Sequence, residues 1–88
     1  MRYSEKRLIK ERNRMLMRRS VEELVKFVNA HKSYYGEKVV EAVNNASYKE
    51  LDIALNKMIV NVPALPEEIR RQCAMWLISR GYDLSWRI

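Results

Sequence analysis

The sequence predicts an all-α fold in one small domain, and three observations support this prediction. Apolar residues recur at helical spacing in every segment of the 88-residue chain. The signals for helix starts and stops agree with that spacing. Gly and Pro number only two each, too few for the many turns of an all-β fold. We therefore expect four to five short helices in a single domain that spans residues 1–88.

The first two helices are predicted from periodicity and from one N-cap. The first helix covers about residues 4–18. Ser20 and Glu23 match the Ser-x-x-Glu capping box, in which each side chain satisfies a free backbone N–H of the other residue. They therefore open a second helix, which ends near His31, and Gly36 provides the turn that follows.

The third and fourth helices are separated by a second capping box. The third helix covers roughly residues 37–45. Ser47 and Glu50 form the next Ser-x-x-Glu pattern and open the fourth helix. One face of that helix is expected to carry five large side chains: Tyr48, Leu51, Leu55, Met58 and Ile59.

Two prolines and a glycine define the fifth helix. The segment 61–66 contains both prolines and breaks the fourth helix, because proline has no N–H and restricts the preceding residue. Pro66 suits the first position of the next helix. Gly81 suits the position just after its end. This helix and the tail behind it occupy about residues 66–88.

The net charge of the chain is concentrated at its N-terminal end. The first 19 residues hold eight Lys or Arg and two acids, which accounts for the whole net charge of +6. At about 100° per residue, five of these cations fall within one arc of about 120° of the first helix. Leu8, Ile9, Met15 and Leu16 fall in the opposite arc, which we take as the core face of this helix. The five cations, named here the basic ridge, are Lys6, Arg7, Lys10, Arg14 and Arg18.

The basic ridge is the candidate nucleic-acid-binding site. Along the helix only Glu11 is spaced to pair with one of its cations. Five like charges in about three turns repel one another, and a phosphate backbone would neutralise them with release of counterions. The alternatives are a solvated surface and an acidic protein partner. A membrane partner is not expected, because the apolar side of this helix lacks the Trp or Phe of membrane-surface helices.

Enzymatic function is not expected, and we predict no catalytic residue, no metal site and no cofactor. His31 is the only histidine and Cys73 the only cysteine, too few for an ordinary zinc site. Cys73 lies on an apolar stripe, which is typical of a small buried hydrophobic residue rather than of a nucleophile. No glycine-rich phosphate loop is present.

The fifth helix is apolar nearly all round, which is typical of a core helix or of an interface. We favour an interface, with Trp76 and Trp86 as anchors, because tryptophan is common at interface hot spots. A homodimer through this helix is one form such an interface could take. The alternative is that Trp86 closes the core.

A helix-turn-helix around residues 44–47 is a weaker hypothesis. DNA-reading helices usually present Arg, Gln, Asn or Ser in the first exposed turn. Here that turn carries Tyr48, Lys49 and Glu50, and Asp52 follows. Acidic side chains near a phosphate wall are unfavourable.

Four segments resemble the Hha/YmoA family of small all-helical bacterial nucleoid modulators. They are Leu16-Met17-Arg18-Arg19, the helix from Ser20 to Val28, Ala46-Ser47-Tyr48-Lys49, and Asn56 to Pro63. The resemblance implies an accessory protein that docks on an H-NS-like nucleoid protein in the cytoplasm. It also implies that Lys49 and Asp52, on the matching helix, contact that partner. The chain departs from the family where Ser47 replaces an acid and Tyr48 replaces a histidine.

Three functional hypotheses follow. The first is a small non-enzymatic bacterial or phage regulator that joins a nucleic-acid complex through a nucleoid protein and adds basic surface. The second is a module that binds DNA or RNA directly through the first helix. The third is a protein–protein inhibitor or assembly subunit that meets an acidic partner.

Overall fold

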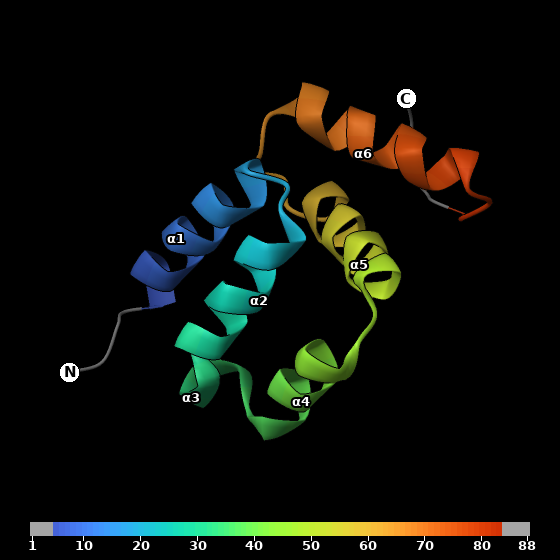
Figure 1. Ribbon diagram of the computed structural model, residues 1–88. Coiled ribbons are helices and arrows are strands. Elements are labelled where there is room, and N and C mark those ends of the chain that lie inside the picture. The colour runs from blue at the N-terminus through green and yellow to red at the C-terminus, as the bar shows by residue number, and fades with distance from the viewer. Residues whose placement is uncertain (1–4, 84–88) are drawn as a thin grey trace.

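The protein is all-α. The computed structural model describes residues 5–83, and within this range the chain forms six helices (Figure 1). The fold class predicted from the sequence is confirmed, with one short helix more than expected. The helices are α1 (Glu5–Met17), α2 (Val21–Ala30), α3 (Lys32–Tyr35), α4 (Glu37–Asn45), α5 (Tyr48–Val60) and α6 (Glu67–Ser79).

Helices α2 and α5 form the centre of the arrangement. Helix α2 contacts α1, α3, α4 and α5, whereas the main neighbour of α6 is α5. Helices α1 and α6 therefore lie on opposite sides of the molecule, blue and orange in Figure 1. The largest fully buried side chains come from α1, α5 and α6, and they are Leu16, Leu55, Ile59, Cys73 and Leu77.

Side-chain caps start α2 and α5, but only one of the two predicted capping boxes is complete. Ser47 accepts a hydrogen bond from the N–H of Glu50, and the Glu50 carboxylate accepts one from the N–H of Ser47, each at 3.1 Å. Ser20 caps α2 by accepting from the N–H of Glu23. The Glu23 carboxylate instead forms an ion pair with Arg18, at 3.4 Å. The prediction of a complete box at Ser20 is therefore wrong, because a nearby guanidinium attracts the carboxylate.

The end of α6 is a Schellman motif around Gly81. This residue has φ of +88°, a conformation that glycine adopts without steric cost. The N–H of Gly81 donates to the carbonyl of Ile78, and the N–H of Tyr82 donates to that of Leu77. The predicted role of Gly81 as the residue after the helix is confirmed, and the motif places Tyr82 beside α5 and α6. Pro66 is the N-cap of α6 rather than its first helical residue.

The turn between α1 and α2 holds a left-handed residue that is not glycine. Arg19 has φ of +48° and follows the last turn of α1. Its guanidinium Nη2 donates to Oδ1 of Asn56, a residue of α5 that is only 3% exposed. This tertiary hydrogen bond helps to hold an L-residue in a conformation that costs roughly 1–2 kcal/mol.

Candidate nucleic-acid interface

All five side chains of the predicted basic ridge are exposed, four of them on α1 and the fifth, Arg18, in the turn directly after it. Leu8, Met15 and Leu16 are buried beneath it, as their shared face predicts. Ile9 is 39% exposed, so its predicted burial is wrong. The single face that α1 packs against α2 and α5 does not extend round to Ile9. The five cations are therefore presented to solvent.

Two of the five ridge cations have a carboxylate partner. Arg7 lies 3.7 Å from Glu11 along the helix, as the spacing predicted. Arg18 lies 3.4 Å from Glu23 across the groove between α1 and α2. Glu11 is therefore the partner along the helix, as expected, and Glu23 is a second partner because the fold brings α2 alongside α1. Both ion pairs involve exposed arginine side chains, and such pairs contribute little to stability in water.

Three ridge cations remain without a carboxylate neighbour in the described part of the chain. No Asp or Glu oxygen among residues 5–83 lies within 4.0 Å of the charged nitrogens of Lys6, Lys10 or Arg14. Together with Arg7 and Glu11, these residues line one shallow hollow on the outer face of α1. This hollow is the least neutralised part of the ridge.

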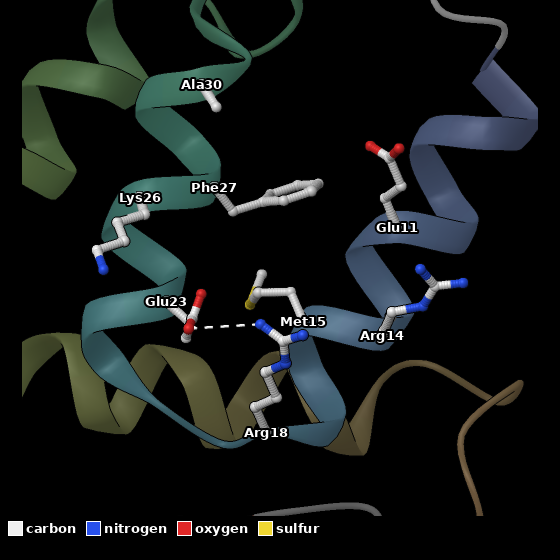
Figure 2. A pocket seen from close by; sticks show the side chains of 8 residues that line it. All are labelled: Glu11, Arg14, Met15, Arg18, Glu23, Lys26, Phe27 and Ala30. Carbon is white, nitrogen blue, oxygen red and sulfur yellow. Dashed lines mark ion pairs between the residues drawn. The ribbon is translucent and has the colours of Figure 1, made fainter.

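The tertiary structure adds one cation that the sequence analysis missed. Lys26 of α2 lies on the far wall of a groove of about 320 Å³ between α1 and α2. Figure 2 shows Phe27 pointing from α2 toward α1, and Arg18 reaching toward Glu23. The helical spacing of α2 alone could not place Lys26 beside α1. The groove, named here the α1–α2 groove, is lined by Glu11, Arg14, Met15, Arg18, Glu23, Lys26, Phe27 and Ala30.

The hollow and the α1–α2 groove form one continuous basic surface, since Glu11 and Arg14 line both. Six basic and two acidic side chains line the two together, which leaves an excess of four positive charges. Glu11 is the acid at the centre of this surface. Its carboxylate also lies 3.6 Å from Nε2 of His31, whose Nδ1 contacts the carbonyl of Phe27 at 2.9 Å.

A second hollow lies between α5 and α6, and it brings together three of the four predicted partner-binding residues. Lys49, Asp52 and Trp76 all line it, although Trp76 is far from the other two in the sequence. Trp86, the fourth, lies outside the described residues. We name this hollow the α5–α6 groove. It has a volume of about 690 Å³ and is lined by Tyr48, Lys49, Asp52, Ile53, Trp76, Arg80 and Tyr82.

The α5–α6 groove contains two residues whose position corrects or extends the sequence analysis. Tyr48 was expected on the buried face of its helix, but it is 68% exposed, because it lines this open hollow. Arg80, the residue before Gly81, was not among the predicted partner-binding residues. Its guanidinium carbon lies 3.7 Å from the centroid of the Trp76 ring, a cation–π contact.

Cys73 lies in the core and offers no accessible nucleophile. Its side chain is 0% exposed, and burial raises the pKa of its thiol. The predicted burial of this residue is confirmed. Among residues 5–83, no three His, Cys, Asp or Glu side chains cluster in a way that could hold a metal ion.

The longest helices of the described chain have 13 residues, and none of its helices combines the length and hydropathy that a membrane span requires.

Comparisons of this chain with known protein families, with curated proteins and with solved structures found no match.

Proposed function

We propose that the protein is a small non-enzymatic regulator that joins a nucleic-acid complex, with the basic surface of α1 and α2 against the phosphate backbone. The observation that carries this proposal is the run of three exposed, unneutralised cations on α1: Lys6, Lys10 and Arg14. Phosphate neutralises such cations and releases condensed counterions, which favours binding at low salt. Arginine also forks onto two phosphate oxygens.

Salt dependence tests this proposal directly. Binding of duplex DNA, single-stranded DNA and RNA would be measured by fluorescence anisotropy at several salt concentrations. Each phosphate contact contributes about 0.9 to the slope of log affinity against log salt for duplex DNA. Replacing Lys6, Lys10 and Arg14 by Gln should therefore lower the slope by about two to three and weaken binding at low salt.

A matched control removes three cations elsewhere, namely Lys32, Lys38 and Arg71, which lie on α3, α4 and α6. Because both variants lose the same net charge, a specific interface predicts a much smaller loss in the control. Failure of all three nucleic acids to bind at about 50 mM salt, where such contacts are strong, would exclude direct binding. Equal losses in the two variants would show that net charge, and not this surface, attracts the nucleic acid.

A second candidate function is that of an accessory protein on an H-NS-like nucleoid protein. It is favoured by the meeting of Lys49, Asp52 and Trp76 in the α5–α6 groove, none of whose lining residues belongs to α1. This arrangement would let the chain bind a protein partner while α1 adds basic surface to the complex. Co-elution of the chain with a purified H-NS-like protein, lost in the Trp76→Ala and Lys49→Glu variants, would support it. Co-elution unchanged by both variants would contradict it.

A further inference from the structure

The α5–α6 groove has the composition of a peptide-binding site. Three aromatic side chains, those of Tyr48, Trp76 and Tyr82, line it together with Ile53. Its volume of about 690 Å³ falls within the range of roughly 300–1,000 Å³ that is usual for ligand sites. Tyrosine and tryptophan bury large apolar areas at little entropic cost, which makes them common anchors of interfaces.

The charge of the groove favours an anionic ligand. Lys49 and Arg80 line it, and Lys57 lies beside it with Nζ 4.8 Å from the centroid of the Tyr82 ring. None of these three cations has a carboxylate of the described chain within 4.0 Å. The one acid of the groove, Asp52, already accepts a hydrogen bond from Nδ2 of the buried Asn56, at 3.4 Å.

Arg80 is positioned to bind a carboxylate while its guanidinium stays over the Trp76 ring. Its Nη1 donates to the carbonyl of Trp76 at 3.1 Å and to Oγ of Ser79 at 3.2 Å, which fixes the guanidinium over the indole ring. Within the described chain, Nε and Nη2 have no acceptor. A guanidinium stacked on an aromatic ring keeps its N–H donors in its own plane, where a carboxylate can bind them.

The same geometry disfavours a nucleic acid in this groove. A base that stacked on the face of Trp76 that Arg80 covers would have to displace the guanidinium, whose carbon lies 3.7 Å from the ring centroid. The carboxylate of Asp52 would repel a phosphate backbone that followed the groove. A peptide avoids both difficulties, because its acidic residues can be spaced to meet Lys49 and Arg80 and to avoid Asp52.

We propose that the α5–α6 groove binds an acidic peptide segment of a protein partner, with an aromatic or aliphatic anchor between Tyr48 and Trp76 and carboxylates on Lys49 and Arg80. This site is separate from the basic surface of α1 and does not depend on nucleic-acid binding there. For the accessory function, the proposal specifies the partner segment as acidic, with one aromatic or aliphatic anchor.

The probe is a synthetic peptide of about ten residues with one central phenylalanine between glutamates and aspartates, titrated into ¹⁵N-labelled full-length protein. We expect chemical-shift changes at Lys49, Arg80 and the indole N–H of Trp76, with smaller changes on α1. Tyr48→Ala and Arg80→Gln should each weaken binding by about fivefold to tenfold. Tyr48 is 68% exposed, so its truncation leaves the core intact.

Matched controls separate this site from nonspecific attraction. Tyr34→Ala removes another exposed aromatic side chain, on α3, and should leave the affinity unchanged. The triple Gln variant of Lys6, Lys10 and Arg14 should still bind the peptide, whatever its effect on nucleic acid. Peptides with alanine in place of phenylalanine, or with amides in place of the acids, should bind about fivefold more weakly or worse.

Three outcomes would overturn the proposal. The first is no shift in the groove at any peptide concentration. The second is binding that Tyr34→Ala weakens as much as Tyr48→Ala does. The third is a thymidine decamer that shifts the groove resonances more strongly than the peptide, which would make the groove a base-stacking site.

Discussion

The guanidinium of Arg19 donates a hydrogen bond to Oδ1 of Asn56 at 3.3 Å, and this bond joins the turn between α1 and α2 to the middle of α5. Asn56 in turn donates from Nδ2 to the carbonyl of Asp52 at 2.8 Å. It is the one buried polar side chain of the described chain, and both ends of its amide have partners. The bond therefore connects the element that carries the basic ridge to the helix that carries the α5–α6 groove.

Substitutions at Arg19 should separate backbone strain from hydrogen bonding. Arg19→Ala loses the bond to Asn56 and keeps an L-residue at φ of +48°. Arg19→Gly loses the same bond but removes the strain, so we expect it to be about 1 kcal/mol more stable than Arg19→Ala. Asn56→Ala should lower the free energy of unfolding by about 1–3 kcal/mol. It leaves a gap and removes the buried amide that bonds to Arg19 and to the carbonyl of Asp52. Urea denaturation measures all three, and equal stability of the Gly and Ala variants would contradict the strain argument.

The capping box of α5 should make stability depend on pH. Two hydrogen bonds with Ser47 lower the pKa of Glu50 below its usual value. The bond from the backbone N–H of Ser47 has the larger effect, and the bond with its side chain has the smaller one. A carboxyl with a lowered pKa in the folded state stabilises the fold above its unfolded pKa, and this contribution is lost as the pH falls through the folded pKa.

The corresponding experiment compares the acid denaturation of the natural protein with that of Glu50→Gln. The variant should be less stable at neutral pH and should lose less stability on acidification. Glu41→Gln, at an exposed position of α4, serves as the control. A pH profile of Glu50→Gln that parallels that of the natural protein would show that the capping carboxylate does not contribute.

Cys73 should react with thiol reagents only when the protein opens. The side chain is 0% exposed and burial raises its pKa, so both access and the thiolate fraction are reduced. With a stability of at least about 5 kcal/mol, its reaction with Ellman's reagent at pH 8 should be on the order of a thousandfold slower than in urea. The control is Cys73→Ala combined with Ser79→Cys, because position 79 is exposed and its thiol should react at once. Similar rates for the two thiols in the folded proteins would contradict the buried position.

Removing the central acid of the basic surface should strengthen nucleic-acid binding. Glu11 lies 3.7 Å from Arg7 and 3.6 Å from His31, and it lines both the hollow and the α1–α2 groove. Glu11→Gln should therefore raise affinity for duplex DNA about twofold to fivefold at low salt, with an effect that shrinks as salt increases. Glu41→Gln is the control, because it makes the same change in net charge on α4. A loss of affinity in Glu11→Gln would show instead that Glu11 holds Arg7 in a binding position.

Most of the helices could be predicted from local signals, because each signal acts within a few residues. The Ser47–Glu50 box, the break at residues 61–66 and Gly81 all specify backbone geometry through their own chemistry. The short helix α3 was missed, since four residues give no periodicity and neither cap of α3 carries a side-chain hydrogen bond. The exposure of Ile9 and Tyr48 was also missed. Periodicity shows which side chains share a face, but not how far a neighbouring helix covers that face.

The sequence by itself determined the all-α class, the helix boundaries to within about two residues, and the placement of five cations along one side of α1 and the turn after it. Only the tertiary structure decided that Glu23 neutralises Arg18, that Lys26 joins the basic surface, and that Lys49, Asp52, Trp76 and Arg80 line one groove. The reason is physical. Capping, proline and glycine effects act within one or two helical turns, whereas the packing of α1 on α2 and of α6 on α5 depends on side chains that are distant in the chain.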